Sequence, residues 1–150
     1  MIRNAQREDL PALISLASQL WPEAEAEELA AGFEAILSDP EAALFLAFSQ
    51  EVPVAFAQCQ LRHDYVEGTD SSPVGYLEGI FVEEPYRRRG YAKLLLAACE
   101  VWAGECGCTE FASDCELENT DSLHFHLSLG FEEANRIICF TKRLIPEDTL

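Results

Sequence analysis

The sequence predicts an α/β protein with a central mixed β-sheet, and two observations support this prediction. First, segments of helical spacing and segments of strand character follow one another in mixed order, without repeats or low-complexity tracts. Second, an apolar strand over residues 75–82 is followed by a glycine turn and an apolar-periodic helix over 90–105. With 150 residues, 49% of them hydrophobic, the chain can bury one good core, so we expect a single domain over residues 1–150.

The first half of the chain is predicted to contain a strand, two helices and a β-hairpin. Asp9 is the predicted N-cap of a helix, because apolar residues recur at helical spacing after it until Trp21-Pro22. Asp39-Pro40 closes the second helix, since the residue before a proline disfavours the helical conformation. The hairpin turns at Ser49-Gln50-Glu51. The predicted elements are a strand at 2–5, helices at 9–20 and 23–37, and strands at 43–48 and 52–62.

The second half is predicted to begin with a loop over residues 63–74 and to contain three strands and two helices. Asn119 is a good N-cap, and Gly130 lies where a left-handed C-cap is expected, so these two residues bound the last helix. The predicted elements are strands at 75–82, 109–114 and 137–142, and helices at 90–105 and 119–129.

The start of the helix at Gly90 is a predicted anion site. The first N–H groups of a helix have no internal partner and lie at the positive end of its dipole. Gly90 allows close approach of a ligand, Ala92 is small, and three consecutive arginines, residues 87–89, add phosphate donors. The spacing matches neither a P-loop nor a dinucleotide-binding loop. The pattern favours a pyrophosphate-bearing cofactor, and an arginine-rich surface turn is the alternative.

The pattern Arg87-x-x-Gly90-x-Ala92 resembles the acyl-coenzyme A loop of the GNAT family of N-acetyltransferases. A second segment, from Asn119 to Phe131, resembles the later motif of that family, in which Asn opens a helix that ends at Gly-Phe. The resemblance implies a GNAT fold, whose sheet is splayed between the strand ending at Val82 and the strand ending at Asp114, with acetyl-coenzyme A bound in the splay. The cofactor-binding residues it implies are Ile80, Phe81, Val82, Arg87, Arg88, Arg89, Gly90, Tyr91, Ala92, Lys93 and Asn119.

Charge and cysteine content narrow the classes of function. The chain has 27 acidic and 10 basic residues, a formal net charge of −17, which excludes nucleic acid as a partner and favours a cationic substrate. A solvated acidic surface is the alternative explanation. The six cysteines form no CxxC pair, so we expect buried free thiols and no metal site. No segment has the length of a membrane span, and no signal peptide is recognised, so we expect a cytoplasmic protein without membrane contact.

Further segments resemble the aminoglycoside 6′-N-acetyltransferase branch of the family, nearly end to end. The resemblance implies that Trp21 and Tyr65 flank the sugar rings and that Glu78 and Asp114 bind the ammonium groups. Asn135 occupies a position at which close relatives carry a further drug contact. Trp21 has the alternative role of a core aromatic residue. The segments that carry the resemblance are 20–22, 62–68, 71–74, 77–82, 112–114 and 118–120.

Acetyl transfer to an amine needs a proton acceptor, because an alkyl ammonium is mostly charged at neutral pH. Glu78 lies on the strand before the cofactor loop and is the candidate, directly or through a water. The alternative is a structural carboxylate paired with a nearby arginine. Asp114 would stabilise a polycation beside Glu78, or it would be a turn residue at a strand end.

The reaction also needs a donor for the negative charge on the acetyl oxygen and a proton for the departing thiolate. The resemblance implies a backbone N–H within residues 80–82 as the donor. Many members of the family place a tyrosine four residues before the Gly-Phe pair as the general acid, and this chain has His126 at that position. His126 would protonate the thiolate, or it would be a packed helix residue. A covalent route through Cys115 is not expected, since no base lies beside it in sequence.

The expected function is transfer of acetyl from acetyl-coenzyme A to the 6′-amine of an aminoglycoside, in a ternary complex. One alternative is a related enzyme that acetylates another cationic amine, such as a polyamine, a lysine side chain or a protein N-terminus. The other alternative is a non-catalytic acyl-coenzyme A sensor. The resemblance also implies a homodimer, in which the last strand crosses between the subunits.

Overall fold

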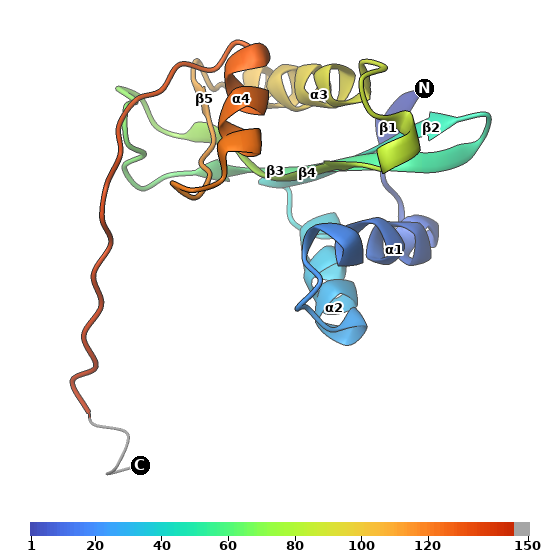
Figure 1. Ribbon diagram of the computed structural model, residues 1–150, viewed down its shortest axis with the longest axis horizontal. Coiled ribbons are helices and arrows are strands. Elements are labelled where there is room, and N and C mark those ends of the chain that lie inside the picture. Colours follow the sequence, from blue (N-terminus) through green and yellow to red (C-terminus); the bar gives the residue numbers. More distant parts are fainter. Residues whose placement is uncertain (146–150) are drawn as a thin grey trace.

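The computed structural model describes residues 1–145 and arranges them as a five-stranded sheet with helices on both faces (Figure 1). The elements in chain order are β1 (Ile2–Asn4), α1 (Leu10–Leu20), α2 (Ala26–Leu37), β2 (Ala42–Ser49), β3 (Val52–Arg62), β4 (Val74–Val82), α3 (Tyr91–Glu105), β5 (Phe111–Ala112) and α4 (Thr120–Ser128), with 3₁₀ turns at Arg7–Asp9 and Glu84–Tyr86. In Figure 1, α1 and α2 lie on one face of the sheet, and α3 and α4 lie on the other.

The strand order in the sheet is β1-β2-β3-β4-β5, the same as the order in the chain. Neighbouring strands are antiparallel from β1 to β4, and β5 is parallel to β4, so the predicted mixed sheet is confirmed. β5 pairs with β4 only at Gly75 with Phe111 and Tyr76 with Ala112. Beyond Tyr76 the two strands diverge, so the sheet is splayed between them, as the resemblance implied.

Each face of the sheet carries its own hydrophobic core. The core under α3 includes the fully buried Leu95 and Cys99. The core under α1 and α2 includes Leu13 and Phe33, which pack with Phe56 of β3. Phe33 and Phe56 meet edge to face, with ring centroids 6.0 Å apart. Both helical layers are therefore held to the sheet by apolar burial, which is the main favourable term in folding.

The face of β3 that meets α1 and α2 changes from apolar to polar along the strand. Alternate residues of a strand share a face, so Phe56 is followed on this face by Gln58, Gln60 and Arg62. None of these three side chains is fully buried. The helices therefore cover the first part of β3 and leave its polar end available for a binding site.

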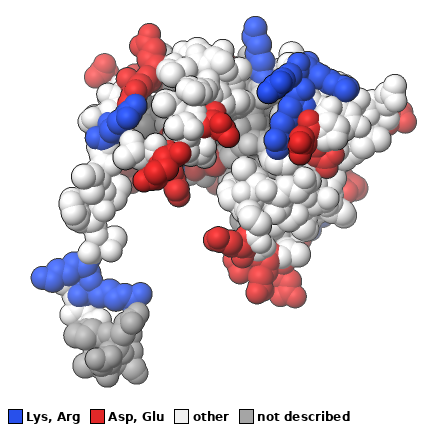
Figure 2. Space-filling model, in the orientation of Figure 1, with Lys and Arg blue, Asp and Glu red and all other residues white. Residues whose placement is uncertain are grey.

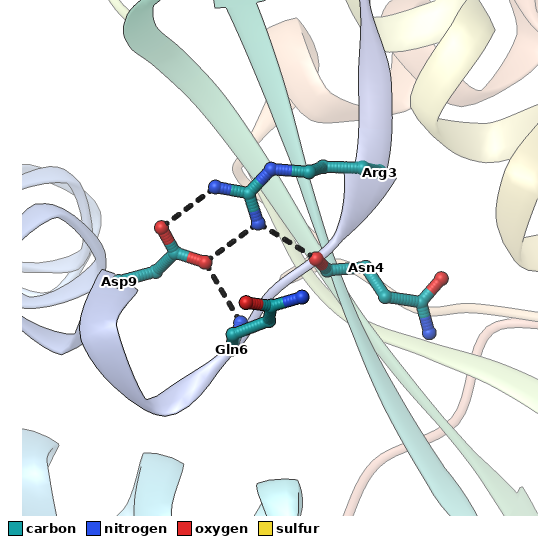
Figure 3. Close-up of polar contacts among 4 residues, drawn as sticks. All are labelled: Arg3, Asn4, Gln6 and Asp9. Carbon is teal, nitrogen blue, oxygen red and sulfur yellow. Dashed lines mark hydrogen bonds and ion pairs between the residues drawn. The ribbon is translucent and has the colours of Figure 1, made fainter.

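An ion pair connects β1 to the start of α1 (Figure 3). Arg3 donates from Nη1 to Oδ2 of Asp9 at 2.7 Å and from Nη2 to Oδ1 at 2.9 Å. Oδ2 of Asp9 also accepts the backbone N–H of Gln6 at 2.7 Å, and Arg3 Nη1 donates to the carbonyl of Asn4. Asp9 is the N-cap residue of α1, as predicted, but its side chain makes no capping bond to that helix. It caps the preceding 3₁₀ turn instead, so the chain begins to turn at Gln6, earlier than predicted.

The predicted hairpin is confirmed, and its turn is tight. Gln50 and Glu51 are the two residues between β2 and β3, and both have left-handed backbone conformations, with φ of 49° and 68°. Two such residues form a type I′ turn, whose twist matches that of the flanking strands.

Two predicted elements are shorter in the structure. The second helix begins at Ala26 rather than at residue 23, because residues 22–24 form a turn in which the Ala24 N–H bonds to the Trp21 carbonyl at 3.1 Å. The strand predicted over 109–114 is reduced to Phe111–Ala112, because β5 leaves β4 where the sheet splays.

The strand predicted over 137–142 is wrong for this chain by itself. Residues 132–143 form neither helix nor strand, and in Figure 1 the segment after α4 runs away from the body of the protein. The backbone N–H and C=O groups of a strand need a neighbouring strand as hydrogen-bond partner, and this segment pairs with no strand of the sheet. Ile138 and Phe140 are consequently 80% and 87% exposed.

The expectation of buried cysteines holds for only two of the six. Cys59 and Cys99 are fully buried, Cys108 is half-buried, and Cys106, Cys115 and Cys139 are exposed. All six are free thiols. Cys59 and Cys99 face each other in the core, and this contact together with burial raises the pKa of Cys59. Within residues 1–145, no helix is long and apolar enough to cross a membrane.

Candidate active site

The loop before α3 has the geometry expected of an anion site. Gly90 has a left-handed φ of 88° and immediately precedes the first residue of α3, and no side chain caps the helix. The first bond of the helix is donated by the Leu94 N–H to the Gly90 carbonyl, at 3.1 Å. The preceding N–H groups of the first turn have no partner inside the helix. A Cβ placed on Gly90 would meet nothing within 4 Å, so a ligand can approach this backbone closely.

The arginines of the loop have different surroundings. Arg87 turns back to β4, where its Nε donates to the Val82 carbonyl at 2.8 Å and its guanidinium lies 5.4 Å from the centre of the Phe81 ring. Arg89 lies 5.4 Å from the centre of the Tyr86 ring. Arg88 is exposed and has a left-handed φ of 64°. Arg87 therefore fixes the loop, while Arg88 and Arg89 offer charge at its surface, where Figure 2 shows basic side chains gathered near the start of α3.

The end of β4 directs two backbone N–H groups toward the splay. The Glu83 N–H bonds to the Val54 carbonyl of β3 at 2.9 Å, in register with the pair Phe81 and Phe56. In an antiparallel ladder alternate residues point their backbone groups to opposite sides, so those of Ile80 and Val82 point away from β3. β5 no longer covers this edge. Ile80 and Val82 therefore fit the predicted donor role better than Phe81, whose N–H faces β3.

Glu78 is the extra residue of a β-bulge in β4. Gln58 of β3 pairs with Gly79, whereas the next residue, Cys59, pairs with Leu77, so Glu78 has no partner of its own in the ladder. The bulge reverses the alternation of side chains along β4. Leu77 and Ile80 both pack into the core under α3, although they are three residues apart. Glu78 consequently lies on the opposite face, with the polar end of β3.

Glu78 is paired with Arg62 on that face. Arg62 Nε donates to Oε2 at 3.1 Å and Nη2 donates to Oε1 at 2.9 Å, so both carboxylate oxygens are engaged. The Glu78 side chain is 18% exposed. The hydrogen bonds to Glu78 hold the pKa of the Arg62 guanidinium above its ordinary value. The alternative role given above, a carboxylate paired with an arginine, is thus present in the structure, whatever further role Glu78 has.

Tyr76 lies between Arg62 and Asp114. The guanidinium carbon of Arg62 is 3.5 Å from the centre of the Tyr76 ring, and the Tyr76 hydroxyl donates to Oδ2 of Asp114. Tyr76 is only 6% exposed, and this burial, followed by the bond to Asp114, raises the pKa of the hydroxyl. Glu78 and Asp114, predicted to act together, are therefore connected through two residues that the sequence analysis did not single out.

His126 faces the point where β4 and β5 diverge. Its Nδ1 is 2.7 Å from the Ser122 carbonyl, which can only accept a hydrogen bond, so Nδ1 carries a proton. Its Nε2 is 2.8 Å from Oγ of Ser113, which directly follows β5, and in the neutral ring Nε2 accepts from that hydroxyl. The ring also lies 5.1 Å from the Phe131 ring. His126 is thus a packed, hydrogen-bonded residue that adjoins the splay.

The predicted sugar-flanking residues line different pockets. Trp21 packs edge to face on Phe56 and covers Gly79, where a Cβ would lie 2.8 Å from the indole. Trp21 also lines a pocket of about 240 Å³ together with Glu28 of α2 and Gln58 of β3. Trp21 is therefore both a core aromatic residue and a wall of a cavity that reaches Gln58, the ladder partner of Gly79.

Tyr65 lies in a second pocket and is 75% exposed. This pocket, of about 460 Å³, is lined by residues 60–65 and so includes Arg62. Asn135 approaches the same loop from the C-terminal segment, since its Nδ2 donates to Oε1 of Glu67 at 2.7 Å. The structure thus places Tyr65 in the pocket that includes Arg62 and Asn135 at the adjoining loop, whereas Trp21 lines the other pocket, at Gln58.

Asn119 acts as the helix cap that was predicted. Its Oδ1 accepts the Ser122 N–H at 3.1 Å. Its contact with the cofactor stays a prediction.

The site also contains four residues for which no role was predicted from the sequence: Arg62, Tyr76, Ser113 and Gln58. Arg62 stood within a segment that carried the family resemblance, but no role was drawn for it. Tyr76 shares the face of β4 with Glu78, since the two are two positions apart along the strand, and this spacing was the available signal. The partners of both residues are distant in sequence and gave no local pattern.

The chain belongs to the acetyltransferase (GNAT) family, whose sequence profile matches residues 4–131. It is similar to aminoglycoside N(6′)-acetyltransferase type 1 of Salmonella typhimurium, with 46% identity over 95% of this chain and 98% of the relative. The enzyme of the same name from Serratia marcescens is 41% identical, over 96% of this chain and 99% of the relative.

Solved structures show the same similarity. AAC(6′)-Iy in complex with the bisubstrate analogue CoA-S-monomethyl-acetylneamine has a TM-score of 0.92 and 45% identity, over 95% of this chain and 97% of that one. The apo aminoglycoside 6′-N-acetyltransferase AAC(6′)-IG from Acinetobacter haemolyticus has a TM-score of 0.93 and 36% identity, over 97% and 99% of the two chains. The splayed five-stranded sheet with its flanking helices is therefore the GNAT fold.

Proposed function

We propose that this protein transfers the acetyl group of acetyl-coenzyme A to the 6′-amine of an aminoglycoside, by direct attack within a ternary complex. The observation that carries the proposal is the position of the carboxylates Glu78 and Asp114 beside the splay of the sheet. The start of α3 lies at the end of the same strand, β4. The opening between β4 and β5 would thus let an acyl donor on one face of the sheet reach an amine on the other.

The residues present fit the cofactor. The uncapped start of α3, the open space over Gly90 and the exposed Arg88, Arg89 and Lys93 suit a pyrophosphate, and Arg87 holds the loop in place. The cofactor supplies a thioester, whose acyl carbon is open to attack by an amine. Ile80 or Val82 would donate a backbone N–H to the acetyl oxygen as negative charge develops there.

The acceptor side is built to hold cations. Glu78 would accept the proton of the attacking amine, directly or through a water, because an ammonium cannot act as the nucleophile. Asp114 would bind a second ammonium group. Trp21 and Tyr65 would contact the sugar rings from two sides, and Asn135 would bound the site from the C-terminal segment. His126 would protonate the departing thiolate only if its hydrogen bond with Ser113 is given up.

The test is release of free thiol from acetyl-coenzyme A with two aminoglycosides that differ only in a 6′-amine or a 6′-hydroxyl. Thiol release with the amine and none with the hydroxyl would support both the reaction and its position. Equal thiol release with both drugs would mean that another amine of the drug is acetylated. No thiol release with either drug, together with turnover of spermine or a peptide amine, would assign the site to another cationic acceptor.

We also infer a homodimer in which the segment after α4 packs on a partner copy. Apolar side chains of this segment are exposed in the single chain, which is unfavourable in water. They are Ile137 (66%), Ile138 (80%), Phe140 (87%), Leu144 (89%) and Ile145 (61%). Sedimentation should give twice the chain mass for the protein and a monomer for Phe140→Asp, while an unchanged mass for that variant would contradict the inference.

A cytoplasmic location accompanies this function. Acetyl-coenzyme A is an intracellular metabolite, and all six cysteines are free thiols, which is typical of proteins in a reducing compartment. Fractionation of the host cell, with detection of the protein in the cytosol or outside it, tests this location.

A further inference from the structure

We propose that Tyr76 is a positioning residue of the acceptor site, whose hydroxyl holds the Asp114 carboxylate beside the Arg62–Glu78 pair. This inference rests on the proposed function, because it concerns the binding of a polycationic acceptor. It is carried by the hydrogen bond from Tyr76 to Asp114 and by the contacts that fix Tyr76 itself.

Asp114 lies where the backbone gives it little support. β5 ends at Ala112, and beyond that residue no ladder bond connects the chain to β4. Asp114 is exposed, whereas Tyr76 is buried within the paired part of β4. The hydroxyl of a buried, strand-anchored ring therefore holds a carboxylate that follows a strand of two residues.

Tyr76 itself has little freedom. Its ring is covered by the Arg62 guanidinium at 3.5 Å, and it packs with Val66 and Val74 in a small cluster of its own. Arg62 can stack on the ring with its face while it donates to Glu78 with its edge, because a guanidinium is planar and carries its N–H groups around the rim. Burial raises the pKa of the Tyr76 hydroxyl, so it stays a donor at neutral pH.

The bond decides what Asp114 can offer to a ligand. Arg62 is near enough to Asp114 for their charges to interact, so a free Asp114 side chain would compete with Glu78 for the guanidinium. The Tyr76 hydroxyl engages Oδ2 and leaves Oδ1 of Asp114 without a hydrogen bond among residues 1–145. In Glu78, by contrast, both oxygens accept from Arg62. Of the two carboxylates, Asp114 is therefore the one with an oxygen that can accept a hydrogen bond from an ammonium group.

A carboxylate held in place before the ligand arrives binds more tightly than one that must be ordered on binding. A hydrogen bond to a charged group contributes on the order of 1.5 kcal/mol, which is about tenfold in affinity. The effect should appear in acceptor binding rather than in the chemical step, since Tyr76 does not touch the reacting atoms.

The experiment is a double-mutant cycle with Tyr76→Phe and Asp114→Asn, assayed with kanamycin and acetyl-coenzyme A. Tyr76→Phe keeps the ring under Arg62 and removes only the hydroxyl. We expect the KM for kanamycin to rise about tenfold, with kcat and the KM for acetyl-coenzyme A within about twofold of wild type. In the Asp114→Asn background the same change should have less than a twofold effect, because the partner of the hydroxyl is already altered.

An unchanged KM for kanamycin in Tyr76→Phe would overturn the proposal, and so would a tenfold rise that persists in the Asp114→Asn background. The midpoint of thermal unfolding is measured for each variant to separate a positioning role from a folding defect. A folding defect would lower the midpoint and would change kcat and both KM values together. If wild type releases no thiol with kanamycin, the proposed acceptor is wrong. The affinity of the four proteins for spermine is then measured by calorimetry. A tenfold loss of affinity on Tyr76→Phe that occurs only in the proteins that keep Asp114 supports the positioning role, and no such loss overturns it.

Discussion

Arg62 and Glu78 form a two-point ion pair between β3 and β4, with Nε–Oε2 and Nη2–Oε1 distances of 3.1 Å and 2.9 Å. Glu78 follows the core-facing Leu77, so ordinary alternation places it on the face that carries Arg62, and the bulge at Glu78 returns Ile80 to the core. An ammonium group that reaches Glu78 must share the carboxylate with a guanidinium already bound to it. Arg62 therefore determines the orientation of Glu78 and limits the hydrogen bonds that Glu78 can still accept from an ammonium group.

Glu78→Gln should lower kcat by about a hundredfold or more, because the amide cannot accept the proton of the amine. Arg62→Gln should lower kcat about tenfold through loss of the fixed orientation of Glu78, without raising the KM for the acceptor, since the site becomes more negative. Steady-state kinetics with an aminoglycoside checks both variants. A rise in acceptor KM at unchanged kcat in Arg62→Gln would mean that Arg62 contacts the drug instead.

His126→Phe should keep most of kcat, because the ring is engaged by Ser113 and Ser122 and a thiolate can leave without help. Ser113→Ala is the matched control, since it removes the partner of Nε2 and keeps the imidazole. The comparison is made from kcat against pH for the three proteins. A loss beyond about a hundredfold in His126→Phe, with full activity in Ser113→Ala, would assign the general acid to His126.

Gly90→Ala should destabilise the protein by about 1 kcal/mol and raise the KM for acetyl-coenzyme A severalfold, because φ at this residue is 88° and its backbone faces the open site. Gly104→Ala is the matched control. Gly104 lies within α3 with open space around it, so alanine should be neutral or stabilise the helix by up to about 1 kcal/mol. Urea unfolding and cofactor kinetics give the two readouts. Equal behaviour of the variants would exclude a role for the left-handed turn.

The Arg3–Asp9 pair should stabilise the fold in a pH-dependent way. The hydrogen bonds from Arg3, assisted by the Gln6 N–H and opposed by burial, hold the pKa of Asp9 below its ordinary value. The folded state therefore favours ionised Asp9, so this stability is present above the unfolded pKa of about 4 and is lost as pH falls through the folded pKa.

Asp9→Asn should accordingly lower the free energy of unfolding by about 1–2 kcal/mol at pH 7, and the difference from wild type should shrink below about pH 4. Urea unfolding at a series of pH values measures it. Asp64→Asn is the control, because Asp64 is exposed and forms no ion pair within residues 1–145. A difference that stays constant with pH would show that Asp9 acts through its shape rather than its charge.

The local elements were predictable because their signals are local. Asn119 caps α4 and Gly130, with φ of 94°, follows its end, as the capping pattern predicted. Gly90 precedes α3 at the glycine turn that the sequence predicted, and its backbone there is left-handed. The last predicted strand failed for the opposite reason, since its residues have strand character but no neighbouring edge in this chain.

The sequence by itself determined the order of helices and strands, the mixed sheet, the cofactor loop and the candidacy of Glu78 and Asp114, because periodicity, caps and motifs depend on residues close together in the chain. Only the tertiary structure decided how the two carboxylates are used. The partners that decide it, Arg62 for Glu78 and Tyr76 for Asp114, are 16 and 38 residues away. They meet through strand register, which one extra residue at Glu78 shifts and which no local pattern specifies.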